Sequence, residues 1–370
     1  ESLSYIAQRL GVESSELMED ISQTEKRNVL EKVEKLYKVE FSELTDEHKQ
    51  IIELIHPIVD KLTLSYESAR LLEIYSRCRY HLNHDDWESH YFKALQLYEQ
   101  LHLYNQSASL ALFKGMILYN QHRYEEALAV ILEERARFDS PNIKLDAMTT
   151  LDYMYAELIL YTSVGNHELT QINMKKAMEF SKDERIFYRI DDIYRLACFQ
   201  SIINENDDER IYYLTKVKQY GEFAENKSST AIATLLETHY YNSYSHEYQK
   251  ALDNVELFLE LASEAQNEKM SNDDNNHYLL EKGKALFGLG FITEALALFE
   301  VYQVPFYLHH PYDLSMSYEV HSYRALCYSH LGELDKALHE AQTGAELISP
   351  LPDTPYKQFI FQTLDEIKKQ

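Results

Sequence analysis

Two stretches near the C-terminal end decide the fold: GKALFGLGFITEALALF at residues 283–299 and ALCYSHLGELDKALHEA at residues 325–341. They can be laid over each other without a gap. Both have a small residue at the start, a glycine seven residues later and an alanine five residues after it: Gly283, Gly290 and Ala295, then Ala325, Gly332 and Ala337. Small residues let antiparallel helices approach closely, and glycine accepts the left-handed backbone of a tight turn. The spacing therefore predicts two helical hairpins of one design.

An earlier stretch, GMILYNQHRYEEA at residues 115–127, has the same small residues, with His122 at the turn and Tyr124 as the packing aromatic. This pattern is similar to the tetratricopeptide repeat. We therefore predict an all-α fold, a right-handed superhelix of about eight to nine tetratricopeptide hairpins, and such arrays usually bind other molecules. Larger residues such as Phe287 and Phe299 are expected to fill the core between hairpins.

The chain divides into three predicted parts: residues 1–20, residues 21–65 with a linker helix and a degenerate first hairpin, and residues 66–370 with the repeats. Glycine (9) and proline (7) are scarce, so helix dominates. Seven hairpins are predicted near residues 66–103, 107–137, 147–181, 187–220, 228–264, 275–303 and 315–347, followed by a capping helix from residue 355. The copies between residues 147 and 264 lack clear alanine and glycine marks, and residues 267–276 are expected to form a polar loop.

Composition limits the partners. The formal net charge is −25, which should repel a phosphate backbone, so direct nucleic-acid binding by this segment is not expected. Three widely spaced cysteines (Cys78, Cys198 and Cys327) have no metal or redox spacing and are typical of reduced core residues. No signal peptide or membrane-spanning run is recognisable, so we expect a soluble cytoplasmic protein without membrane contact.

No motif indicates catalysis. The sequence has no Gly-x-Ser-x-Gly elbow and no phosphate-binding glycine loop. One polar cluster could supply metal ligands, but it lacks zinc-type spacing and falls at a predicted turn: His81, His84, Asp85, Asp86, Glu88 and His90. We expect no cofactor, no metal ion and no enzymatic activity.

The first residues differ from the repeats. The stretch LSYIAQRLGV at residues 3–12 is similar to the closing helix of lambda-repressor-like helix-turn-helix domains, and the matching positions are Leu3, Ile6, Ala7, Leu10, Gly11 and Val12. The alternative is an ordinary amphipathic helix that ends in Leu-Gly. If the match holds, residues 1–20 are the remnant of a DNA-binding domain whose recognition helix lies upstream of Glu1, and DNA would be bound only through that missing part.

Such a remnant followed by an acidic, tyrosine-rich array resembles the peptide-sensing regulators of Gram-positive bacteria, the Rap, NprR, PlcR and PrgX group, and the length is most similar to the NprR type. Phage arbitrium receptors are an alternative. The resemblance implies a cytoplasmic quorum-sensing receptor that binds a signalling peptide of roughly 5–10 residues in the channel formed by the first helices of the hairpins. It also implies a change of assembly, as a homodimer or homotetramer, and control of transcription and of a response regulator of the sporulation phosphorelay, contacted before residue 110. The alternative from another class is a constitutive scaffold for a partner protein segment.

Asparagine suits the points where an extended peptide meets successive helices. The peptide rises about 3.3 Å per residue and neighbouring helices lie roughly 8–10 Å apart, so a hairpin meets every third peptide residue. An asparagine amide can satisfy both the N–H and the C=O of one peptide unit. The candidates are Asn206, Asn226, Asn242 and Asn276, although each could equally be a turn or helix-end residue.

The register fixed by Gly283 and Ala325 predicts which positions face the groove: His277, Leu280, Lys284 and Phe287, then Glu319, Ser322, Leu326 and Ser329. Lys284 could meet a peptide carboxylate, or could form an intramolecular salt bridge instead. Arg77 and Arg79 are the equivalent candidates at the other end of the channel.

Overall fold

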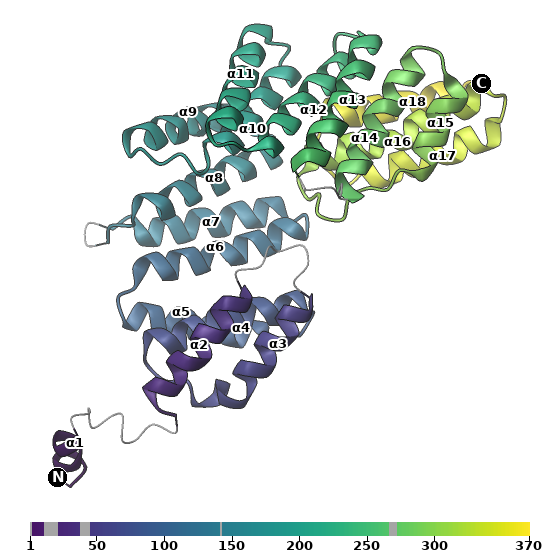
Figure 1. Ribbon diagram of the computed structural model, residues 1–370. Coiled ribbons are helices and arrows are strands. Elements are labelled where there is room, and N and C mark those ends of the chain that lie inside the picture. Colours follow the sequence, from purple (N-terminus) through teal and green to yellow (C-terminus); the bar gives the residue numbers. More distant parts are fainter. Residues whose placement is uncertain (1, 11–20, 38–44, 141–142, 266–271) are drawn as a thin grey trace. The chain divides into compact units, whose positions relative to one another are not determined.

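The computed structural model describes residues 2–10, 21–37, 45–140, 143–265 and 272–370. Within these ranges every regular element is a helix: 18 α-helices and one short 3-10 helix (Figure 1). The helices follow one another as antiparallel pairs joined by tight turns. The predicted all-α class and the tetratricopeptide-like hairpin array are confirmed.

The N-terminal elements are α1 (Ser2–Leu10), α2 (Gln23–Tyr37), α3 (Thr45–Ile55) and the 3-10 helix η3 (His56–Lys61). The hairpins that follow are α4 (Tyr66–His81) with α5 (Trp87–Gln100), α6 (Tyr104–Asn120) with α7 (Tyr124–Phe138), α8 (Ala147–Ser163) with α9 (His167–Asp183), and α10 (Ile190–Ile203) with α11 (Asp207–Phe223). The last are α12 (Lys227–Ser243) with α13 (Tyr248–Ala265), α14 (Asn272–Gly288) with α15 (Ile292–Val301), and α16 (Pro311–His330) with α17 (Leu334–Ile348), before the final helix α18 (Pro355–Ile367).

All seven hairpins predicted between residues 66 and 347 are present, and the final helix begins at Pro355 as expected. The predicted polar loop at residues 267–276 is wrong in its second half, because α14 already begins at Asn272. In the N-terminal match, α1 covers residues 2–10, whereas Gly11 and Val12 lie outside the described residues. The three-part domain division stays a prediction.

The small residues lie where the two helices of a hairpin cross. A Cβ atom added to Gly283 in α14 would come within 2.4 Å of the Phe299 ring in α15. Ala325 in α16 and Ala337 in α17 are both fully buried. Phe299 is fully buried as well, so the large side chain fills the space that the missing Cβ leaves. The crossing therefore needs glycine at residue 283 for steric reasons.

The hairpin turns share one backbone geometry. Gly290 and Gly332 have φ values of +85° and +80°, and His122 takes the same left-handed region at 60°. Each such residue closes the preceding helix; for example, the Phe291 N–H donates to the Leu286 carbonyl at 2.9 Å. In the middle of the chain, Gly165 has this conformation in the α8–α9 turn at φ +72°, and Glu205 and His246 have it in the α10–α11 and α12–α13 turns. Arg185 and Glu225 have it in the connections between hairpins. The turns at Glu205 and His246 have no glycine to mark them, although the left-handed conformation costs about 1–2 kcal/mol for most side chains.

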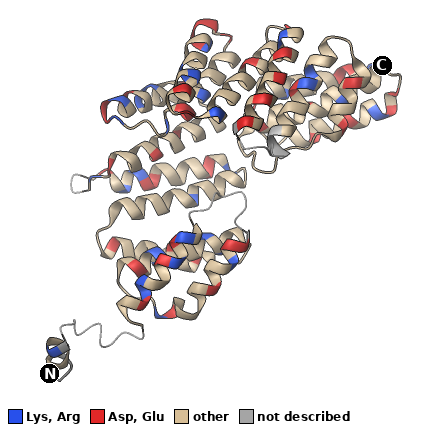
Figure 2. Ribbon diagram, viewed as in Figure 1, with Lys and Arg blue, Asp and Glu red and all other residues tan. Residues whose placement is uncertain are grey.

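The chain forms two compact units. Unit 1 comprises Glu1–Gly115 and Val130–Thr149, and unit 2 comprises Met116–Ala129 and Thr150–Gln370. The core of unit 1 contains a buried carboxylate, Glu73, which forms ion pairs with Arg70 and Arg77 and accepts a hydrogen bond from the Tyr98 hydroxyl at 2.7 Å. Acidic and basic side chains are interspersed along the helices of each unit (Figure 2). No helix among the described residues is long and apolar enough to cross a bilayer.

Unit 2 contains contacts between hairpins that are not neighbours in the chain. Phe199 of α10 packs against Tyr312 of α16 and Tyr356 of α18 in one buried aromatic cluster. His310, the N-cap of α16, lies 3.0 Å from the Thr162 hydroxyl of α8. An array that relied on neighbour contacts alone would have none of these. Unit 2 is therefore held together across the array as well as along it.

We predict that Gly283→Leu lowers the free energy of unfolding by about 1–3 kcal/mol, because a side chain there must displace the buried Phe299 ring. The measurement is urea unfolding followed by circular dichroism. Ala297→Leu is the matched control, since Ala297 is exposed on α15 and should change stability by less than about 0.5 kcal/mol. Equal unfolding midpoints for the two variants would contradict the steric account of the crossing.

Candidate functional site

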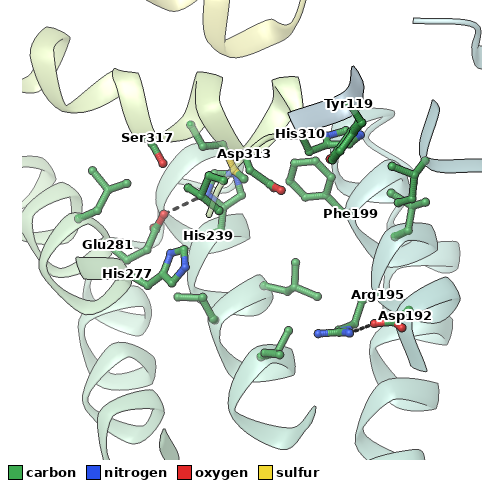
Figure 3. A pocket seen from close by; sticks show the side chains of 18 of the residues that line it. Tyr119, Asp192, Arg195, Phe199, His239, His277, Glu281, His310, Asp313 and Ser317 are labelled. Carbon is green, nitrogen blue, oxygen red and sulfur yellow. Dashed lines mark hydrogen bonds and ion pairs between the residues drawn. The ribbon is translucent and has the colours of Figure 1, made fainter. Parts of the chain in front are cut away.

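A cavity of about 390 Å³ lies within unit 2 (Figure 3). Its lining residues come from the first helices of successive hairpins, α6, α8, α10, α12, α14 and α16, and from the segment just before α16. This is the set of helices on which the sequence predicted a ligand channel. The volume falls in the range of about 300–1,000 Å³ that is typical of small-ligand sites.

The lining positions repeat with one helical spacing. Within each of these helices they lie three or four residues apart, and in α10 and α12 also seven residues apart, as expected for one face. The sets are Asp192, Arg195, Leu196 and Phe199 in α10; Ile232, Leu235, Leu236 and His239 in α12; His277, Leu280 and Glu281 in α14; and Asp313, Met316 and Ser317 in α16. Half of these side chains are apolar, so the cavity combines hydrophobic surface with polar and charged groups at fixed places.

One polar group of the cavity is an ion pair on α10. The Arg195 guanidinium contacts the Asp192 carboxylate one turn earlier and lies 4.0 Å from Asp191 (Figure 3). Both partners of the pair are less than one-third exposed. The charges of Arg195 and Asp192 compensate each other, so this pair adds polarity to the wall without adding net charge.

A second polar group belongs to a buried network beneath the cavity. Nδ1 of His239 lies 3.1 Å from Oε1 of Glu281, and Nε2 lies 2.8 Å from the Tyr356 hydroxyl of α18. Asn242 donates to both the carboxylate and the backbone carbonyl of Glu281, each at 2.8 Å. Lys284 completes the network, 3.3 Å from Glu281 and 2.7 Å from Glu319. Helices α12, α14, α16 and α18 are thus joined by buried polar contacts.

The two carboxylates of this network differ in their partners. Burial alone would raise the pKa of Glu281, but Lys284, His239 and Asn242 all stabilise its charge and hold the pKa well below the usual range. Glu319 has Lys284 as its main partner, and burial raises its pKa. Burial opposes the charge on Lys284, but the two carboxylates raise its pKa. We therefore assign the Glu281–Lys284 pair as the charged centre of the network.

A third group, Asp313 of α16, differs from the others. It lines the cavity, yet it makes no hydrogen bond or ion pair with any residue that the structure describes. Burial raises its pKa to about 6. Nearby, Nδ1 of His310 accepts from the Tyr312 N–H at 3.3 Å, so its Nε2–H is the group that donates to Thr162. Burial lowers the pKa of His310 to about 4, so this ring is neutral at pH 7 and does not compensate Asp313.

The structure gives the four predicted asparagines different places. Asn206 and Asn226 are N-caps, accepting from the Glu209 and Ser229 N–H groups at 3.3 Å. The Asn276 side chain accepts from the Gln303 N–H at 3.0 Å and joins two parts of one hairpin. Asn242 is buried against Glu281 beneath the cavity. None of the four lines the cavity, and their contact with a ligand remains a prediction.

The groove positions predicted for α14 agree better with the residues that line the cavity than those predicted for α16. His277 and Leu280 line the cavity, and His277 also lies 3.0 Å from the Tyr307 hydroxyl. Lys284 is only 1% exposed and takes part in the intramolecular ion pairs rather than presenting its ammonium to the cavity.

In α16 the residues that line the cavity differ from the predicted groove positions, whose contact with a ligand stays a prediction. The cavity is lined by Asp313, Met316 and Ser317, whereas Ser322 is fully buried and lies outside the lining. The reason is that α16 starts at Pro311 and has 20 residues, so its first turns extend beyond the predicted hairpin start at residue 315. The three-four-seven spacing, applied to every first helix, would have found Asp192, Arg195 and His239. Asp313 requires the true start of α16.

Arg77 and Arg79 belong to α4 in unit 1. Arg77 pairs with Glu73 at 3.1 Å, and its guanidinium lies 4.6 Å from the centre of the Phe113 ring. Arg79 pairs with Asp86 at 2.5 Å and reaches the Tyr75 hydroxyl at 3.3 Å. Both arginines thus have partners within unit 1, and their proposed role at a peptide terminus stays a prediction.

No protein-family model matches the chain, and no curated protein matches it in sequence. Among solved structures, the chain is similar to yeast Tom70, with a TM-score of 0.44 and 15% identity over 88% of this chain and 59% of Tom70. It is also similar to a tetratricopeptide repeat protein from Parabacteroides merdae, with a TM-score of 0.43 and 13% identity over 87% of this chain and 98% of that protein. The chain therefore spans less than two-thirds of the Tom70 structure.

We predict that Asp313→Asn stabilises the protein at pH 7.5 by about 1–3 kcal/mol, because a folded-state pKa near 6 against the usual 3.8 means that ionisation disfavours the folded state. The gain should shrink as the pH falls below about 6 and vanish near 4, where the carboxyl is protonated in both states. Urea unfolding at several pH values measures it. Asp335→Asn, at an exposed position on α17, is the control for the loss of one negative charge. A gain at pH 7.5 that persists unchanged to pH 4 would show that the charge of Asp313 is not its cause.

Proposed function

We propose that the chain is a binding protein, without catalytic activity, that holds an extended peptide segment against the first helices of unit 2. The observation that carries this proposal is the lining of the cavity. Residues from α8, α10, α12, α14 and α16 recur at one helical spacing and present mainly apolar side chains. A peptide running across successive helices would place alternate side chains against such a surface, while the few polar groups fix its position.

The finer proposal follows from the resemblance to the Gram-positive peptide-sensing regulators. We propose a cytoplasmic quorum-sensing receptor whose ligand is a short signalling peptide, and whose outputs are transcription and a response regulator of the sporulation phosphorelay. Binding would shift the population between two assemblies, such as a homodimer and a homotetramer, because the peptide binds one of them better. The support is the resemblance of residues 3–12 and of the repeats, together with the cavity.

The second candidate is a constitutive scaffold for a segment of a partner protein. Tetratricopeptide-like arrays in general serve as protein-binding scaffolds, and the same apolar lining suits a partner segment. The two candidates differ in ligand and response. A sensor binds a free short peptide and changes its molar mass in solution, whereas a scaffold binds a longer segment and keeps its molar mass.

We predict that Ile232→Asp weakens capture of short peptides by at least about tenfold, because it puts an unpaired charge on the apolar wall formed by α12. The measurement is mass spectrometry of peptides smaller than about 1.5 kDa retained from spent Gram-positive culture medium, with light scattering of the protein before and after loading. Ser228→Asp is the matched control, since Ser228 is exposed on the same helix outside the cavity lining.

Three results are informative. Retention of one short peptide by the wild-type protein and by Ser228→Asp, with a change of molar mass, supports the sensor. Retention of no short peptide, with an unchanged molar mass, favours the scaffold. Equal retention by Ile232→Asp would place the peptide elsewhere and refute the cavity as its site.

A further inference from the structure

Not every charged side chain that lines the cavity has a partner of opposite charge. Asp192 is paired with Arg195, and Glu281 is paired with Lys284. Asp313 is the lining carboxylate to which the described residues supply neither a cation nor a hydrogen-bond donor. Isolated carboxylates are disfavoured away from water, so buried acidic groups in folded proteins are normally paired. Asp313 is half-buried and lies in the first turn of α16, where the helix dipole favours a negative charge, but unlike Asp192 and Glu281 it has no cation beside it.

The surroundings of Asp313 are aromatic. Tyr119, Tyr155 and Phe199 line the same cavity, and Figure 3 shows Tyr119, Phe199 and His310 in the same region as Asp313. The charge of Asp313 acts on the hydroxyl groups of two of these tyrosines. Burial raises the pKa of Tyr119, and the charge of Asp313 raises it further. It also contributes to the raised pKa of Tyr155, where burial is the larger cause.

Aromatic faces beside a carboxylate form a site for a cation. The ring faces are the negative ends of the aromatic quadrupoles, and they attract an ammonium or guanidinium group, while the carboxylate supplies the opposite charge and two acceptors. A divalent metal ion needs several oxygen or nitrogen ligands. The part of the chain that the structure describes contains no cluster of three or more histidine, cysteine, aspartate or glutamate residues able to hold one.

We infer that Asp313, with the rings of Tyr119, Tyr155 and Phe199, forms a subsite for one organic cation of the bound segment, and that a ligand for this cavity must carry such a group next to apolar side chains. This inference rests on the proposed function and adds the chemical class of the ligand. The cation can come from a free α-amino terminus or from a lysine or arginine side chain. In either case it supplies the partner that Asp313 lacks in the unliganded chain.

The subsite also anchors one point of a bound segment. Asp313 is on α16, whereas the apolar stripe Leu235–Leu236 is on α12 and the Asp192–Arg195 pair is on α10. A cation held at Asp313 leaves the neighbouring apolar residues of the segment to contact α12 and α10. A neutral segment could contact the same apolar residues, but it would leave the carboxylate unpaired.

The test uses equimolar synthetic peptide pools of one length with random apolar residues. They differ at one position, which is lysine or norleucine, and at the amino terminus, which is free or acetylated. Retention on the full-length chain is quantified by mass spectrometry. We expect the wild-type protein to retain the cationic pools at least about tenfold better than the acetylated norleucine pool, and Asp313→Asn to lose this preference. Asp313→Glu, which keeps the charge, should restore part of it.

Two controls separate this inference from other causes. Asp335→Asn lowers the acidic net charge equally but lies outside the cavity, so it should keep the wild-type preference. Comparison of the four pools identifies the group that supplies the bound cation. Acetylation abolishes retention if the α-amino terminus binds, and norleucine abolishes it if the lysine side chain binds.

The failures are distinguishable. If the wild-type protein retains all pools equally, or if Asp313→Asn keeps the preference for cations, the subsite is refuted while peptide binding stands. If no pool is retained by any variant, the proposed binding of short peptides fails together with the subsite.

Discussion

The cavity of unit 2 exists because non-adjacent hairpins touch. In a simple helical-repeat array each hairpin contacts only its neighbours, and the first helices line an open surface. Here the ring of Phe199 on α10 meets Tyr312 and Tyr356, which belong to α16 and α18. The imidazole of His310 reaches Thr162 on α8. These contacts bring α16 against the earlier first helices, and side chains from six helices then surround one space.

The polar groups inside unit 2 are of two kinds: some form a buried network that joins the helices, and one carboxylate of the cavity lies outside that network. The network of His239, Glu281, Lys284 and Glu319 is buried and its members satisfy one another, which is the condition under which buried charges are tolerated. Asp313 has no such partners. A carboxylate that lines a cavity without a cation beside it is typical of a functional site, where an interaction with the ligand can supply the partner.

Local sequence patterns predicted the hairpins well, because their main requirements are local. A small residue at the crossing and a left-handed residue at the turn are both visible at Gly283 and Gly290. The middle hairpins were predicted mainly from apolar spacing, since Glu205 and His246 occupy the left-handed turn position of two of them without a glycine to mark it.

The site was harder to predict for physical reasons. Lys284 lies on the predicted face, but its partner Glu319 comes from a helix 35 residues away, so no local pattern shows that the ammonium is already paired. Asp313 was missed because the start of α16 depends on Pro311 and on contacts of His310 with α8. The polarity of a position can be read from the sequence, but its partners depend on the tertiary fold.

The hydrogen bond between Tyr356 and His239 has a consequence for the way the C-terminal end opens. The last helix of a repeat array normally frays first, since it has a neighbour on one side only. Detaching α18 would remove Tyr356 from the Phe199 ring and leave the buried Nε2 of His239 without its hydroxyl partner. The disturbance would reach α12 and α10 directly, which belong to the third and fourth hairpins before α18 in the chain. Opening of the C-terminal end is therefore coupled to loosening of the cavity wall, and unit 2 should lose its structure cooperatively rather than by progressive fraying.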